Sequence, residues 1–289
     1  MNVKADHLYV SYGKYHAIED VSFELNGPKI YGLLGRNGAG KTSLLSTLAA
    51  FREPSKGAIT VNGEAPFENA EIMQQVAFLY NKDYKDETSH LKEMIKDTKF
   101  YRPHFDSEYA DYLIDRFGLD KKKAIKKMSK GMQAAVNVIL GLAARAPITI
   151  FDEVYLGMDA PSREIFYEEL LQEQERHPRI FILSTHLVSE MEYLFDEVII
   201  IKNGKLLLQE EYDSLVAKGA TITGNETQVD TFVMSKEQLN EKRLGKTKSV
   251  MIYGELEEKD IQVANNLGLD VSPISLHELF VHLTKEREL

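Results

Sequence analysis

Apolar residues follow two different patterns along the chain. Apolar and polar residues alternate in VSFEL (21–25) and AITVNG (58–63), beside turn residues at 26–28 and 62–63. This alternation predicts half-buried antiparallel strands early in the chain. By contrast, IYGLL (30–34), ITIF (148–151) and RIFILSTH (179–186) are runs of mainly apolar residues, and the latter two lead into polar residues. Such runs are typical of parallel strands that are buried on both faces of a sheet.

Helical patterns fall between these strands and predict an α/β fold. From about residue 83 to 144 the chain reads as mainly helical and charged, which predicts a helical insertion between the strand VAFLYN (76–81) and the strand ITIF. We expect one large domain over residues 1–211. Residues 212–289 are expected to form a small α+β appendage, with strands in ATITGN, KSVMIYG and LDVSPI and with helices near 235–243, 257–266 and 275–286.

Composition narrows the possible functions. The chain has 289 residues, of which 43% are hydrophobic, and this is enough to bury a core. The absence of cysteine excludes disulfides and thiolate chemistry and fits a reducing compartment. No apolar run reaches the roughly 18 residues of a membrane helix, and the start lacks a signal-peptide core. A net charge of −10 argues against a nucleic-acid partner. We therefore expect a cytoplasmic protein.

The segment GRNGAGKT, residues 35–42, stands between a predicted strand and a predicted helix. This context predicts a phosphate-binding loop, in which Gly35, Gly38 and Gly40 allow backbone amides to face phosphate oxygens at a helix N-terminus. Lys41 supplies a charge for the β and γ phosphates, and Thr42 supplies a hydroxyl for Mg²⁺. The other predicted nucleotide-binding residues of this segment are Asn37, Ala39 and Ser43. The alternative, a chance glycine-rich turn, does not explain the full motif.

Two further strand ends carry candidate catalytic residues. Asp152 and Glu153 end the strand ITIFDE, where Asp152 would bind the metal and Glu153 would hold or deprotonate the attacking water. Alone, such a pair is more often a helix cap and a first-turn acid. His186 ends the strand FILSTH, and it would touch the γ phosphate and hold Glu153 in place. A lone histidine is usually a packed or solvated residue.

These motifs, in this order, resemble those of the ATP-binding cassette ATPases over about residues 3 to 210. The resemblance implies a P-loop NTPase fold of that type, with ATP and Mg²⁺ bound and ATP hydrolysed. It also implies that Tyr12, in SYGKYHAIEDVSFEL, stacks on adenine, although Tyr15 competes for this role. Where the family has a glutamine, this chain has Asn81, which is shorter but still able to contact Mg²⁺ or water. Where the family has a proline after Glu153, this chain has Val154 and Tyr155.

MSKGMQ, residues 128–133, is similar to the family's signature segment, with Ser129 and Gly131 retained and Met128, Lys130 and Met132 substituted. The resemblance implies that this segment opens a helix and binds the phosphate of a nucleotide on a facing subunit. A helix cap at Ser129 uses the same geometry, so the two interpretations agree. Asp159, in LGMD, matches the loop that crosses the dimer interface. Six lysines among residues 121–130 are read as a solvated face or as a source of positive potential beside the phosphate site.

The resemblance implies an ATPase subunit that pairs with a second ATPase subunit, identical or different, and with a separate transmembrane permease. It would lie in the cytoplasm, peripheral on the inner face of the cell membrane. The signature variant, FYRPHFD and the tail look most like exporters of antimicrobial peptides in Gram-positive bacteria, of the bacitracin-resistance or phenol-soluble modulin type. A soluble cassette protein that acts on ribosomes or DNA, and a P-loop kinase or GTPase, are the alternatives. The role of the tail is left open, and SLHELFVHL is as compatible with core as with a partner surface.

Overall fold

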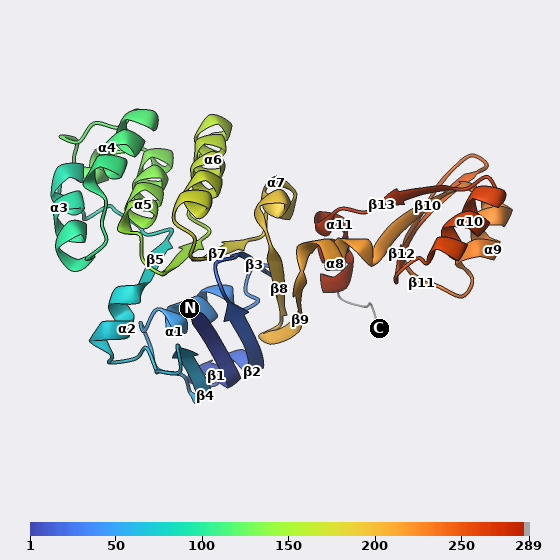
Figure 1. The fold of residues 1–289 in the computed structure, drawn as a ribbon, viewed down its shortest axis with the longest axis horizontal. Helices are drawn as coiled ribbons and strands as arrows, with labels where there is room; N and C mark the ends of the chain where they lie inside the picture. Colours follow the sequence, from blue (N-terminus) through green and yellow to red (C-terminus); the bar gives the residue numbers. More distant parts are fainter. Residues whose placement is uncertain (286–289) are drawn as a thin grey trace. The chain divides into compact units, whose positions relative to one another are not determined.

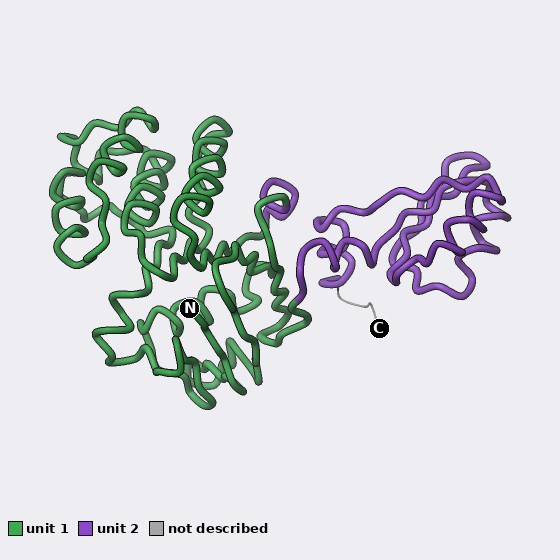
Figure 2. Tube along the Cα trace, in the orientation of Figure 1, with its two compact units in different colours: residues 1–186, 193–209 green, residues 187–192, 210–289 purple. Residues whose placement is uncertain are grey.

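The computed structural model describes residues 1–285. The chain divides into two compact units (Figure 2). Unit 1 comprises Met1–His186 and Tyr193–Gln209, and unit 2 comprises Leu187–Glu192 and Glu210–Leu289. No helix within residues 1–285 is long and apolar enough to cross a membrane.

Most of the helices and strands are labelled in Figure 1. In the first part of the chain they are β1 (Asn2–Tyr12), β2 (Tyr15–Asn26), β3 (Ile30–Leu34), α1 (Lys41–Leu48), β4 (Lys56–Val61), α2 (Ala70–Gln75), β5 (Val76–Tyr80), α3 (Leu91–Tyr101), α4 (Ser107–Arg116), η1 (Ile125–Lys127), α5 (Lys130–Ala144), β6 (Ile148–Asp152) and α6 (Ala160–Arg176). Then follow β7 (Ile180–Thr185), α7 (Val188–Met191), η2 (Glu192–Leu194), β8 (Glu197–Lys202), β9 (Lys205–Glu211), α8 (Tyr212–Ala217), β10 (Gly219–Asn225), α9 (Glu226–Val233), β11 (Glu237–Leu244), β12 (Thr247–Tyr253), α10 (Glu258–Asn266), β13 (Asp270–Pro273) and α11 (Leu276–Thr284).

Unit 1 contains two sheets. Strands β2, β1 and β4 form a three-stranded antiparallel sheet, and a six-stranded sheet has the order β5-β6-β7-β3-β8-β9. The pairs from β5 to β8 in that order are parallel. Every residue of β3, β6 and β7 is buried, as their continuous apolar runs predict. The predicted α/β class is therefore confirmed.

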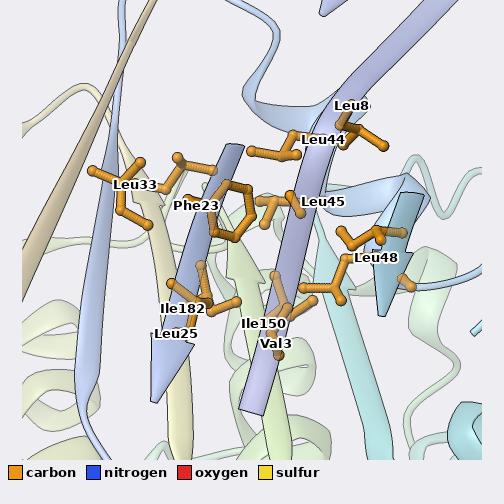
Figure 3. Packing of buried hydrophobic residues seen from close by; sticks show 14 of the residues in the cluster. Val3, Leu8, Phe23, Leu25, Leu33, Leu44, Leu45, Leu48, Ile150 and Ile182 are labelled. Atoms are coloured by element: carbon orange, nitrogen blue, oxygen red, sulfur yellow. The ribbon is translucent and has the colours of Figure 1, made fainter. Parts of the chain in front are cut away.

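Helix α1 connects the two sheets through one hydrophobic core. Its residues Leu44, Leu45 and Leu48 are buried among side chains of both sheets, such as Phe23 and Ile182 (Figure 3). Since α1 directly follows the predicted phosphate loop, this packing holds the loop's helix firmly on the parallel sheet.

Helices α3, α4 and α5 occupy the predicted insertion. Asp106 caps α4 by accepting a hydrogen bond from the Tyr109 backbone N–H, and Ser129 caps α5 by accepting one from Met132 N–H. Helix α5 packs against α4 and β5 and is buried along most of its length. The signature segment therefore starts a helix that is fixed within the fold.

Unit 2 contains an antiparallel sheet with the order β11-β12-β10-β13. Its core joins Ile222, Val250 and Ile252 of the sheet to Phe232 of α9 and Ala264 of α10. The strands expected in 220–225, 248–254 and 269–274 are present, as are the helices expected near 257–266 and 275–286, the last residue of which lies outside the described residues.

One expectation for unit 2 is wrong. A helix was expected near 235–243, but Glu237–Leu244 is the strand β11, and the helix α9 precedes it. The residues of β11 are good helix formers, yet Gly245, with φ of 62°, closes a turn that pairs β11 with the apolar strand β12. Pairing within the sheet has overridden local helix propensity.

Candidate functional site

The predicted phosphate loop connects β3 to α1 and borders a cavity of about 260 Å³. The cavity is lined by Tyr15, Ala17, Asn37, Gly38, Ala39, Gly40, Lys41, Thr42, Ser43 and Glu153. Glycine is required at residue 40, where φ is 107° and a Cβ atom would lie 2.4 Å from the Ala17 carbonyl oxygen. At Gly35, a Cβ atom would lie 2.8 Å from the Ile201 carbonyl oxygen. The glycines thus allow a tight loop whose amides start α1.

Lys41 lies between the loop and a carboxylate. Its side chain is 6% exposed, and its ammonium donates a hydrogen bond to the Gly35 carbonyl oxygen at 2.7 Å. The same nitrogen lies 3.4 Å from Glu153 Oε1. A buried ammonium needs such acceptors, and these place its positive charge at the mouth of the loop.

Thr42 and Asp152 form a set of oxygen donors. The Thr42 hydroxyl donates a hydrogen bond of 2.6 Å to Asp152 Oδ2. Asp152 is 5% exposed, and its Oδ1 atom has no hydrogen-bond partner among residues 1–285. A buried carboxylate oxygen without a partner is costly, and a hydroxyl and a carboxylate are ligands that Mg²⁺ prefers. These residues fit the predicted metal.

Glu153 and His186 meet at the ends of β6 and β7, which are neighbours in the sheet. His186 Nδ1 lies 3.0 Å from Glu153 Oε1. Glu153 has φ of 50°, an uncommon value outside glycine, and its backbone N–H donates to the Ser184 carbonyl oxygen at 3.2 Å. This turn directs the Glu153 carboxylate toward the cavity that the phosphate loop borders.

Of the residues predicted at the edge of the site, Tyr15 lines the cavity, whereas Tyr12 and Asn81 do not. The Tyr12 hydroxyl lies 3.3 Å from Ser43 Oγ, and the Arg52 guanidinium covers one face of the Tyr12 ring at 3.8 Å. Asn81 is exposed and directly follows β5. Since Tyr80, the last residue of β5, is in register with Asp152, Asn81 lies beside the end of β6.

The signature residues form a second group. A Cβ atom at Gly131 would lie 2.7 Å from the Gly157 carbonyl oxygen, so the start of α5 contacts the turn that leads to Asp159. Asp159 caps α6, and hydrogen bonds from Ser162 hold the pKa of its carboxyl below the usual value. Ser129, Gly131 and Asp159 are not among the described residues that line the loop's cavity.

Some contacts were not anticipated from the sequence. The buried Gln133 amide donates to the carbonyl oxygens of Ile125 and Met128, which fixes the chain just ahead of the signature segment. Lys130 lies 3.6 Å from Asp83 across exposed surface. The Tyr155 hydroxyl lies 2.7 Å from Thr185 Oγ1 in the interior. The glutamine in MSKGMQ was a possible signal for the first of these contacts.

A larger cavity, of about 560 Å³, lies elsewhere in unit 1. Its lining includes Pro147, which precedes β6, and Ile180, which begins β7, so it borders the amino ends of these strands. Ligands of parallel sheets bind at the carboxyl ends, where the loop, Asp152 and His186 lie. The smaller cavity is therefore the candidate site, and its residues define a nucleotide-binding P-loop protein.

Comparison with known proteins gives the family. Residues 18–155 match the family described as ABC transporter. The ABC transporter ATP-binding protein NatA of Bacillus subtilis is 31% identical over 206 residues, which are 69% of this chain and 83% of NatA. The bacitracin transport ATP-binding protein BcrA of Bacillus licheniformis is 31% identical over 222 residues, which are 74% of this chain and 71% of BcrA.

A solved structure of the ATP-binding subunit of an ABC transporter has a TM-score of 0.65. It covers 74% of this chain and 92% of its own, at 23% identity, and this likeness shows the fold alone. Together with the sequence relatives, these findings place the chain in the ABC transporter family, as an ATP-binding subunit. It is an ATPase, because the members of this family hydrolyse ATP to power transport.

Proposed function

We propose that this ATPase closes as a dimer around ATP and so drives a separate transmembrane permease. The observation that carries this proposal is the cluster at the loop's cavity, in which Glu153 Oε1 lies 3.0 Å from His186 Nδ1 and 3.4 Å from Lys41 Nζ. One carboxylate there faces both a cation and an imidazole. The imidazole orients the carboxylate, and the lysine places it beside the phosphate loop, which is geometry suited to a general base for hydrolysis.

The loop would hold the ATP phosphates through its backbone amides and through Lys41, which would exchange its present acceptors for phosphate oxygens. Thr42 and Asp152, with Asn81, would hold Mg²⁺, which when bound neutralises phosphate charge during transfer. Stacking of adenine is assigned to Tyr12, whose ring lies beside Ser43 of the loop. Arg52 would support that ring from its other face.

Glu153 would orient the attacking water and accept its proton as the water oxygen bonds to the γ phosphorus. The bond between this phosphorus and the β–γ bridging oxygen would break, and ADP would leave. His186 would contact the γ phosphate and, through its hydrogen bond, keep Glu153 in the productive orientation. Lys41 would stabilise the negative charge on the departing phosphate oxygens.

Closure would bring Ser129, Gly131 and Asp159 of one chain to the nucleotide on the other. Support comes from the helix start at Ser129 and from the contact between Gly131 and Gly157, which links the signature segment to the turn before Asp159. Residues 1–211 would form the nucleotide-binding domain and residues 212–289 an accessory domain. The second subunit is an identical or a related chain.

The permease would dock on the helical insertion. A groove of about 290 Å³ there is lined by residues of β5, α3 and α5, among them Phe78 and Tyr101. Phe100, next to Tyr101, is 82% exposed. Exposed aromatic residues beside a groove are typical of protein interaction sites. The protein would then lie peripherally on the cytoplasmic face of the membrane, and the similarity to the bacitracin transport protein supports a peptide-type export substrate.

The test is the ATPase rate as a function of protein concentration. A site shared between chains predicts that specific activity rises with concentration. Ser129→Asp is expected to abolish this rise, because aspartate still caps α5 but repels the phosphate. Ser129→Asn, which caps the helix without charge, is the matched control and should keep the rise. A specific activity that is constant with dilution, or equal for the two variants, would contradict the dimer.

The permease is tested separately. A chain purified from detergent-solubilised membranes should carry a subunit with membrane spans. Recovery with ribosomes or DNA instead would support the soluble-cassette alternative and exclude the transport role.

A further inference from the structure

Tyr155 stands two residues after Glu153 and points into the interior of unit 1. Its side chain is 2% exposed, and its hydroxyl lies 2.7 Å from Thr185 Oγ1. Thr185 is fully buried, ends β7 and immediately precedes His186. A tyrosine hydroxyl that is buried this deeply needs a hydrogen-bond partner, and here one partner adjoins a predicted catalytic residue.

Three polar contacts connect segment 153–155 with segment 184–186. The Glu153 backbone N–H donates to the Ser184 carbonyl oxygen at 3.2 Å, and the Glu153 carboxylate lies 3.0 Å from the His186 ring. The contact between Tyr155 and Thr185 is the third. Both of the first two contacts depend on how Glu153 is oriented. The third contact involves neither Glu153 nor His186, and it joins Tyr155, two residues after Glu153, to Thr185, which is next to His186.

Glu153 needs such support because of its backbone. A non-glycine residue with φ of 50° is held in a conformation that costs on the order of 1–3 kcal/mol and persists only when its surroundings fix it. A tyrosine side chain has few rotatable bonds, so Tyr155 forms a rigid connection between the turn after Glu153 and β7. Its carbonyl oxygen also accepts a hydrogen bond from Met158 N–H at 3.0 Å, which shapes the turn ahead of Asp159.

We propose that Tyr155 is a positioning residue for hydrolysis, which holds Glu153 and His186 in register through its hydrogen bond to Thr185. This inference rests on the proposed roles of Glu153 and His186.

The first test is Tyr155→Phe, which removes one oxygen atom and keeps the packing. We expect kcat to fall about tenfold while KM for ATP changes less than about twofold, because misplacement of catalytic groups affects turnover rather than binding. Tyr31→Phe is the matched control: Tyr31 is fully buried in β3, in the sheet that contains β7, and its hydroxyl donates a hydrogen bond to the Asn26 carbonyl oxygen at the end of the strand away from the phosphate loop. That control should leave kcat unchanged, and thermal melting should show both variants folded.

A second pair of variants approaches from β7. Thr185→Val removes the hydroxyl at nearly constant volume and should reproduce the fall in kcat, whereas Thr185→Ser keeps the hydroxyl and should stay within about threefold of the wild type. Thr185→Val also carries the test if Tyr155→Phe does not fold. Equal rates for the valine and serine variants would overturn the inference.

A double variant separates positioning from mere structure. If Tyr155 acts through the pair, Tyr155→Phe should lower kcat less than about twofold in a His186→Ala background. A full further tenfold loss there would refute this role. If Tyr155→Phe has wild-type kcat while Glu153→Gln is inactive, only this inference fails. Unchanged turnover in Glu153→Gln would instead remove the proposed active site.

Discussion

Replacing Glu169 with glutamine should loosen the helical insertion from α6. Glu169 is fully buried, and its carboxylate accepts hydrogen bonds from the hydroxyls of Tyr109 at 2.8 Å and Tyr112 at 3.0 Å. Arg116 forms an ion pair with the same carboxylate. All three donors belong to α4, so the buried carboxylate of Glu169 on α6 holds α4, and with it the helical insertion, against α6.

The expected cost follows from this geometry. Glutamine keeps the shape and one acceptor oxygen, but it turns the other oxygen into a donor that faces donors, and it leaves Arg116 without its buried countercharge. Breaking a buried ion pair costs about 3–5 kcal/mol, and the retained acceptor favours the lower end, about 3 kcal/mol. For a unit of roughly 200 residues, each kcal/mol lowers the melting temperature by about 2–4 °C, which gives a fall of about 6–12 °C.

The neighbouring residue provides the control. Glu168 also pairs with Arg116, but its side chain is 55% exposed, so Glu168→Gln should cost less than about 1 kcal/mol. Thermal unfolding followed by circular dichroism, with ATP absent, measures both variants. Melting temperatures that fall equally in the two variants would refute the argument from burial.

Three further predictions concern the site and unit 2. Glu153→Gln should bind ATP normally but lose at least about a hundredfold in turnover and elute as a dimer with ATP, and unchanged turnover would remove Glu153 from its role. Gly131→Ala places a Cβ atom 2.7 Å from the Gly157 carbonyl oxygen, so it should cost about 1–3 kcal/mol and abolish the rise of ATPase activity with concentration, as melting and kinetics would show. Burial lowers the pKa of His282, so its folded-state pKa lies below its unfolded value. Its contribution to the stability of unit 2 is then complete above the unfolded pKa and is lost as pH falls through the folded pKa, and a His282→Gln variant should show a weaker loss of stability between pH 7 and 5.

The positions of the strands of unit 1 could be predicted from the sequence, but which strands pair with each other in the sheet could not. Runs such as IYGLL and ITIF identify buried parallel strands, because every position must be apolar when both faces are covered. That β3 lies between β7 and β8 could not be inferred, since these neighbours are more than a hundred residues away along the chain. The error at β11 has the same origin, because Gly245 and pairing with β12 decide that segment rather than its own residues.

For the candidate site, local motifs carried most of the information. The loop, Asp152, Glu153 and His186 could each be selected because a short apolar strand ends at or next to them, and the structure brings them together. Tyr155 could not be selected in this way. Its partner Thr185 lies 30 residues further on, and nothing local distinguishes a tyrosine that only fills the core from one whose hydroxyl also forms a hydrogen bond beside the proposed catalytic pair.

The central place of β3 has a consequence for synthesis of the protein on the ribosome. Strand β3 pairs with β7 and β8, so the segment that leads into the phosphate loop emerges early and then waits for roughly 150 more residues before a neighbouring strand exists. At about 5–20 residues per second, this wait lasts about 8–30 seconds. During that time both hydrogen-bonding edges of an apolar strand lack their partner strands. We therefore expect nascent chains that end before about residue 185 to depend on chaperones.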